Sequence, residues 1–133
     1  MSTPVQRFLY ISRLAPDTAP DAVSQILRQS RERNRANAIS GALVFDGERF
    51  CQLIEGTAEA VATLASRIVL DPRHVDLRVL LDASDATPRL LQPWQTGYCD
   101  PERLDALDAA APMAPAQALA LFIEMLADCD LSH

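Results

Sequence analysis

Two side chains in this sequence, Tyr10 and Gln52, have types and surroundings that suit hydrogen-bond chemistry in a protein interior. Strand alternation over residues 49–54 places Gln52 on one face between Phe50 and Ile54. A carboxamide buried there costs a few kcal/mol unless a partner hydrogen-bonds it. A phenol is a natural partner, because glutamine presents an acceptor and two donor hydrogens and tyrosine can donate or accept. From the residues alone, such a pair serves as structural glue as readily as it serves a function.

Asn34 and Trp94 are candidates for the same side of the structure. Asn34 continues the apolar stripe of a predicted helix, which comprises Val23, Ile26, Leu27 and Ser30. Its side chain therefore points toward the core, although asparagine also suits a helix C-terminus. The only tryptophan, Trp94, lies in an extended segment over residues 89–98. Four arginines between positions 28 and 35 form either an anion site or a solvated helix face.

The elements that must position these residues follow from turn signals and periodicity. Asp46-Gly47 predicts a two-residue type I′ turn that pairs residues 42–45 with 49–54. Further strands are expected at residues 5–12, 77–81 and 89–98. A second helix follows Gly56-Thr57 and stops before Pro72.

This order of elements predicts an α+β fold. We expect a ferredoxin-like split βαβ arrangement with a five-stranded mixed sheet and two helices on one face. Residues 1–98 would form the core of the domain. Residues 99–133 would pack on the same domain as C-terminal helices covering the other face: a short one after Asp100 and a last one over residues 116–128. The wide apolar sector of the last helix favours either a dimer or partner interface or generous packing within one chain.

Composition restricts the class of protein. The chain has 133 residues and a net charge of −6, which argues against a general nucleic-acid binder. No apolar run approaches the roughly 18 residues that a membrane span requires, and the first residues lack the apolar core of an export signal. The three cysteines at positions 51, 99 and 129 have no CxxC spacing. This favours reduced thiols in the cytoplasm over a disulfide framework or a metal site.

As a set, several short segments resemble the BLUF family, blue-light sensors that use a flavin. The matching segments are Phe8-Leu-Tyr10-Ile-Ser12, Ser30-Arg-Glu-Arg-Asn34, Ile39-Ser-Gly-Ala-Leu-Val-Phe, Arg49-Phe-Cys-Gln52-Leu-Ile-Glu-Gly56, Asp71-Pro-Arg-His74 and Trp94. They extend from about residue 7 to about residue 98. The resemblance implies that a flavin ring, that of FAD with FMN as the alternative, lies between the two helices. The residues that match cofactor-binding positions are Asn34, Ile39, Phe50, Arg67, Asp71 and His74.

The resemblance also implies a photochemical mechanism. Excited flavin is a strong oxidant, so Tyr10 gives it an electron and then a proton through Gln52. Recombination leaves Gln52 rotated or tautomerised, with its hydrogen-bonding ends exchanged. Exchanging donor and acceptor at a buried group shifts a local equilibrium by ~1–3 kcal/mol, enough for a switch. Trp94 would pass the signal on to a downstream protein partner.

Two positions depart from the family pattern. Thr96 stands where the family usually has methionine, and Leu91 where it has an aromatic residue. The departures lie around Trp94, so they bear on the output of the switch and leave the flavin chemistry intact. We hypothesise that the Thr96 hydroxyl hydrogen-bonds Gln52, which a thioether would do only weakly.

We therefore expect a cytoplasmic, non-enzymatic light switch that forms homo-oligomers and binds neither nucleic acid nor membrane. Two alternatives remain at this stage. One is a flavinless relative that serves as an interaction module. The other is a small acylphosphatase-like enzyme that uses Asn34 and an arginine, although the first loop has no glycine-rich phosphate cradle.

Overall fold

The computed structural model describes residues 3–19, 21–109 and 113–132. Its elements, in chain order, are β1 (Val5–Leu14), α1 (Asp21–Ala36), β2 (Ser40–Phe45), β3 (Arg49–Gly56), α2 (Ala58–Leu70), β4 (His74–Asp85), β5 (Gln95–Tyr98), α3 (Pro101–Asp105), α4 (Pro115–Met125), the 3-10 helix η1 (Leu126–Asp128) and β6 (Asp130–Ser132). The sheet order is β4-β1-β3-β2-β5-β6. All neighbouring strands are antiparallel except β2 and β5, which are parallel.

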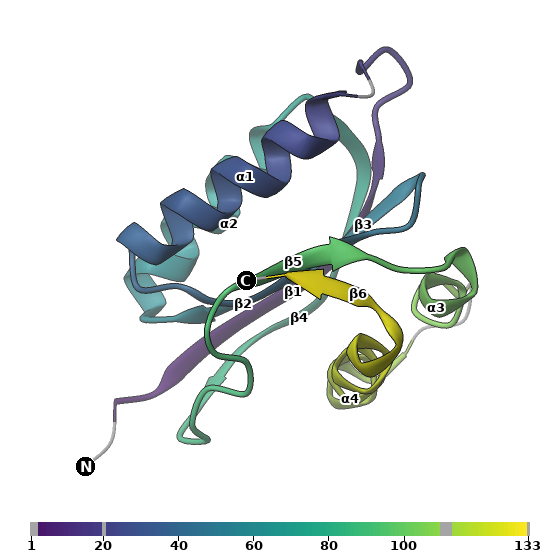
Figure 1. The fold of residues 1–133 in the computed structure, drawn as a ribbon. Helices are drawn as coiled ribbons and strands as arrows, with labels where there is room; N and C mark the ends of the chain where they lie inside the picture. The colour runs from purple at the N-terminus through teal and green to yellow at the C-terminus, as the bar shows by residue number, and fades with distance from the viewer. Residues whose placement is uncertain (1–2, 20, 110–112, 133) are drawn as a thin grey trace.

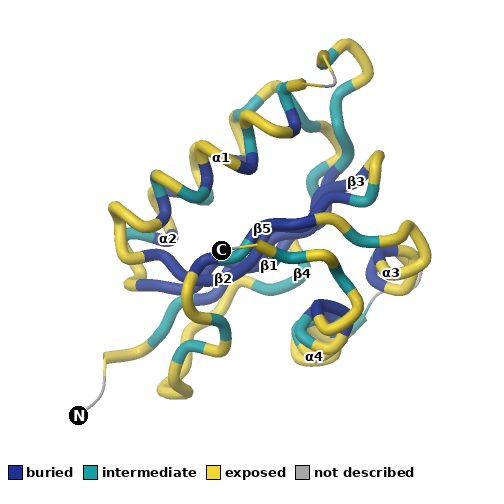
Figure 2. Tube along the Cα trace, in the orientation of Figure 1, coloured by how far each residue is buried: buried dark blue, intermediate teal, exposed yellow. Residues whose placement is uncertain are grey.

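The predicted fold class is confirmed, with helices on both faces of a mixed sheet. Figure 1 shows α1 and α2 over one face and α3 and α4 over the other. The central strands β1, β3 and β2 are buried along most of their length, as Figure 2 shows. A sheet covered on both faces explains why these strands carry large apolar residues on both sides.

Alternation along the strands divides the interior into two cores. The α1/α2 core contains Phe8, Tyr10, Phe50 and Ile54 from the sheet, together with apolar residues of α1 and α2. The C-terminal core lies on the opposite face and is built from the alternate strand residues and the apolar sides of α3 and α4. Most of the wide apolar sector of α4 is thus used within the chain, since Ala118, Phe122 and Met125 are buried there.

The hairpin turn differs from the prediction. Gly47 has a φ of +101°, whereas Asp46 is not among the residues with positive φ. The central residues are therefore Gly47 and Glu48, one position later than expected, because glycine at the first central position suits a type II′ turn. The Asp46 carboxylate accepts hydrogen bonds from the backbone N–H of Glu48 at 2.9 Å and of Arg49 at 2.6 Å. The Asp46 carboxylate thus stabilises the turn by accepting the hydrogen bonds that a backbone carbonyl would otherwise accept.

The C-terminal part also differs. The sheet has six strands in place of five, because β6 pairs with β5 after the last helix ends at Met125. The predicted strand over residues 89–98 shrinks to Gln95–Tyr98, so Trp94 lies just before β5. A cis peptide bond joins Gln92 to Pro93 in the preceding segment. The predicted strand over residues 77–81 extends to His74–Asp85.

Candidate functional site

Tyr10 and Gln52 face each other across β1 and β3. They are direct partners in the antiparallel register, and Gln52 Nε2 donates a hydrogen bond to the Tyr10 hydroxyl at 2.7 Å. The exposed fractions are only 4% for Tyr10 and 3% for Gln52. Burial raises the pKa of Tyr10 above its ordinary value, and the bond from Gln52 offsets part of that rise. The phenol therefore keeps its proton throughout the neutral range.

Two of the cavities on this face concern the candidate site: one lies between the sheet and the helix pair, and the other lies between α1 and α2. The smaller, of about 40 Å³, is lined by Tyr10 and Gln52 together with Phe50, Asp71 and His74. The larger, of about 290 Å³, is lined by Asn34, Ile39 and Arg67 among others. Arg33 lines both cavities. The larger volume is close to the lower end of the range for small-molecule sites, about 300–1,000 Å³.

Among the polar side chains of the site, Asn34 gives the clearest indication of a ligand. It is 1% exposed, two residues before the end of α1, and its side chain points inward as the helical stripe predicted. Within the described part of the chain, neither its Oδ1 nor its Nδ2 has a hydrogen-bond partner. An unpaired buried carboxamide costs about 1–3 kcal/mol, so a group with adjacent donor and acceptor atoms would satisfy it.

Three arginines give this end of the site a positive character. Burial lowers the pKa of Arg33, and the neighbouring charges of Arg67 and Arg73 lower it further. Burial alone would raise the pKa of Asp71, but the hydrogen bonds and charge of Arg73 outweigh it, so the pKa is lowered. Asp71 Oδ2 lies 2.7 Å from Arg73 Nη2.

His74 is engaged through both ring nitrogens. Nδ1 lies 2.8 Å from the Ser12 hydroxyl, and Nε2 pairs with the backbone carbonyl of Ile68. The ring packs edge-on against Tyr10 and Phe50, with centroids 5.9 and 6.4 Å apart. His74 thus braces the cavity wall and connects the start of β4 to α2.

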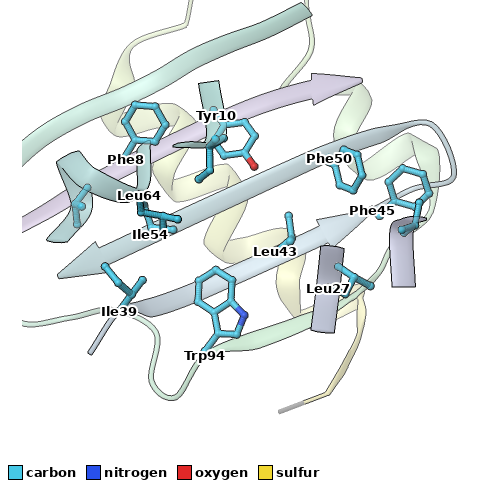
Figure 3. Packing of buried hydrophobic residues seen from close by; sticks show 13 residues of the cluster. Phe8, Tyr10, Leu27, Ile39, Leu43, Phe45, Phe50, Ile54, Leu64 and Trp94 are labelled. Atoms are coloured by element: carbon cyan, nitrogen blue, oxygen red, sulfur yellow. The ribbon is translucent and has the colours of Figure 1, made fainter. Parts of the chain in front are cut away.

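Trp94 is 1% exposed and belongs to the α1/α2 core. Figure 3 shows its indole beside Leu43 and Ile39, on the face that carries Tyr10. A Cβ on Gly41 would lie 1.9 Å from the Leu53 carbonyl oxygen and 3.2 Å from the indole ring. Only glycine therefore allows this approach at position 41, where φ is +133°.

The family model described as sensors of blue light using FAD matches residues 5–97. The chain belongs to the BLUF family. Photoactivated adenylate cyclase subunit beta of Euglena gracilis is 30% identical over 95 residues, which are 70% of this chain and 11% of that protein. The chain therefore spans only a small part of the curated relatives that it matches.

Among solved structures, the BLUF protein BlrB in its dark state matches with a TM-score of 0.73 and 26% identity, covering 96% of this chain and 98% of that one. Klebsiella pneumoniae BlrP1, solved with FMN and cyclic diGMP, matches with a TM-score of 0.65 and 28% identity, covering 94% and 30%. The family assignment disfavours both alternatives that the sequence left open. Within the described ranges, no helix of this BLUF chain is both long and apolar enough to cross a bilayer.

Thr96 and Leu91, the two residues that depart from the family pattern, each make a hydrogen bond in this BLUF domain. Thr96 Oγ1 accepts a hydrogen bond from Arg31 Nη2 at 2.8 Å. Leu43 stands between Thr96 and Gln52 in the strand register, so the hypothesised Thr96–Gln52 bond is wrong for this structure. The backbone N–H of Leu91 donates to the Glu55 carboxylate at 2.9 Å.

Sequence reasoning missed a buried ion pair that positions the segment before Trp94. Arg7 Nε lies 2.8 Å from Glu55 Oε2, with exposed side-chain fractions of 3% and 0%. Arg7 also donates to the carbonyls of Thr87 and Pro88, while Glu55 accepts from the N–H of Leu90. The only signal in the sequence was that Arg7 and Glu55 are charged residues next to apolar residues within predicted strands.

Proposed function

We propose that this chain is a blue-light photoreceptor in which Tyr10 and Gln52 form the photochemical switch. The observation that carries the proposal is their 2.7 Å hydrogen bond, buried in the wall of a cavity under α1 and α2. Membership of a family of blue-light sensors supplies the reaction class, and the two side chains supply the groups that it needs.

The cofactor is a flavin, and we propose FAD with FMN as the alternative. Asn34 would pair with the donor and acceptor atoms along the polar edge of the ring, because its own carboxamide is buried and unpartnered. Ile39 and Phe50 would pack against the ring, and Arg67, Asp71 and His74 would complete the site. The positive charges of Arg33, Arg67 and Arg73 favour a ligand that carries phosphate. Both FAD and FMN carry phosphate. The family description names FAD, whereas BlrP1 was solved with FMN.

A bound flavin supplies a ring that absorbs blue light and becomes a strong oxidant when excited. Tyr10 is placed to give up an electron and the proton of its hydroxyl, which burial holds in the protonated form. Because Gln52 Nε2 donates to the Tyr10 hydroxyl in this structure, the carboxamide would have to rotate or tautomerise before its oxygen end could take up that proton. When the electron and the proton return to Tyr10, Gln52 would be left with the donor and acceptor ends of its carboxamide exchanged. Such an exchange at a buried group is worth ~1–3 kcal/mol.

Residues 1–98 would form the light-sensing unit, and β5 would relay its state. Trp94 precedes β5 directly, and β5 pairs with β2, the neighbour of the strand that carries Gln52. The signal would leave through residues 99–133 to a downstream protein partner. We further propose that the protein forms homo-oligomers and works in the cytoplasm.

The deciding experiment is an absorption spectrum of the purified protein. A yellow protein whose absorption shifts slightly to the red under blue light and relaxes in the dark supports the proposal. A protein that takes up neither FAD nor FMN after refolding would remove it. A protein that binds flavin with no reversible shift would separate cofactor binding from switching and would overturn the roles of Tyr10 and Gln52.

A further inference from the structure

Cys99 and Cys129 both lie just beyond the same end of the β5–β6 ladder. The antiparallel register pairs Thr96 with Ser132, Gly97 with Leu131 and Tyr98 with Asp130. One further step of this register places Cys99 opposite Cys129. Directly opposed residues in antiparallel strands have Cα atoms about 4.5–5.5 Å apart, which lies within the span that a disulfide bridges.

Both thiols point to the same face of the sheet. Cys99 and Cys129 pack against the C-terminal core, as does Leu131, which is two residues from Cys129 on the same strand. Each thiol contributes to the pKa shift of the other, which indicates that the two lie near each other, and Cys129 Sγ donates to the Met125 carbonyl at 3.2 Å. The strand register and the shared face therefore bring the two side chains toward each other beyond the end of the ladder.

The third cysteine provides a contrast. Cys51 is 0% exposed, whereas Cys99 and Cys129 are only partly buried. Cys51 lies on β3, and β2 separates it from β5. Two strand spacings amount to about 9.5 Å, which exceeds the reach of a disulfide. The structure thus distinguishes one pair that can be bridged from one thiol that cannot join it.

We propose that Cys99 and Cys129 form a reversible disulfide with each other. The oxidant is a small-molecule disulfide such as glutathione disulfide. One cysteine attacks glutathione disulfide, which forms a mixed disulfide and releases one glutathione thiol. The second cysteine attacks the protein sulfur of that mixed disulfide and releases a second glutathione thiol. The two cysteine protons end on the two glutathione molecules, and the two electrons lost by the cysteines reduce the glutathione disulfide.

The bond would close a loop that contains α3 and α4 and would fasten β6 to β5. In a reducing compartment the pair would stay open, and it would close under sustained oxidation, as transient cytosolic disulfides do. Burial raises the pKa of Cys99 to about 12, and burial also raises that of Cys129. The thiolate that attacks is therefore scarce at neutral pH, so exchange is slow there and becomes faster as the pH rises. This inference does not depend on flavin binding.

The test uses the full, folded, reduced chain in the dark, equilibrated with glutathione disulfide and then quenched with acid for peptide mapping. We expect a cross-linked peptide pair containing Cys99 and Cys129 in most molecules, with Cys51 still a thiol. Cys51→Ser should leave this cross-link unchanged, and Cys99→Ser should stop at a single glutathione adduct on Cys129. If the wild-type thiols remain free, carry separate glutathione adducts, or cross-link to Cys51, the proposal is wrong.

Discussion

Gln52 Nε2 donates to the Tyr10 hydroxyl across two central, antiparallel strands at 2.7 Å. The hydrogen bond lies at the boundary between a rigid sheet and a cavity under two helices, so its geometry is set by strand register and its other side is open to a ligand. This combination of a fixed partner and a free face is what a hydrogen-bond switch requires.

Tyr10→Phe should bind flavin normally and lose the light-induced red shift, because the ring still packs while the donor of the electron and proton is gone. Absorption spectra before and after blue light give the measurement. Tyr98→Phe is the matched control, since Tyr98 is 48% exposed and lines neither of the two cavities of the candidate site. A normal photocycle in Tyr10→Phe would remove Tyr10 from its role.

Asn34→Leu should have opposite effects on the apoprotein and on flavin binding. The apoprotein should gain about 1 kcal/mol in free energy of unfolding, because a buried amide without partners is removed. Flavin affinity should fall about tenfold through lost hydrogen bonds. Urea unfolding and flavin titration measure the two effects, with the exposed Gln25→Leu as control. Unchanged affinity would show that Asn34 does not hold the cofactor.

Glu55→Ala should destabilise the fold by about 1.5–3 kcal/mol, because the buried Arg7 loses one of its two carboxylate partners and keeps only the more exposed Asp85. The segment before Trp94 should loosen as well, since the N–H groups of Leu90 and Leu91 lose their acceptor. Urea unfolding and amide hydrogen exchange of residues 90–91 test both effects. Glu32→Ala, on the exposed face of α1, should change stability by less than about 0.5 kcal/mol.

Thr96→Val should free Arg31 and increase amide exchange in β6, because Arg31 Nη2 also approaches Ser132 Oγ at 3.4 Å. Thr96→Ser keeps the hydroxyl and should exchange like wild type. Since Leu43 separates Thr96 from Gln52, the dark-recovery rate should change little in Thr96→Val. A large change in that rate, with unaltered β6 exchange, would restore a direct link between Thr96 and the switch.

The Asp71–Arg73 pair should make stability depend on pH in the acid range. The folded pKa of Asp71 lies below its ordinary value of 3.8, so the pair stabilises the fold above that value. This contribution disappears as the pH falls through the folded pKa, where the carboxylate gains a proton. Thermal midpoints of wild type and Asp71→Asn should differ at pH 6 and converge once the pH falls below the folded pKa of Asp71. Parallel curves across the range would contradict this assignment.

The sequence by itself determined which face of each strand is buried and which polar residues share it. Alternation placed Gln52 between Phe50 and Ile54, and helical periodicity turned Asn34 inward; both placements agree with the structure. These are local consequences of the strand and helix repeats, so they need no knowledge of neighbours. The βαββαβ order likewise followed from turn signals and periodicity.

Only the tertiary structure decided which residues meet. The Tyr10–Gln52 bond requires β1 beside β3 in one register, and the Arg7–Glu55 pair joins residues that are 48 positions apart. The Arg31–Thr96 bond and the sixth strand depend on where α1 and the C-terminal segment return to the sheet. Such contacts are set by long-range packing, which the sequence pattern of each element does not contain.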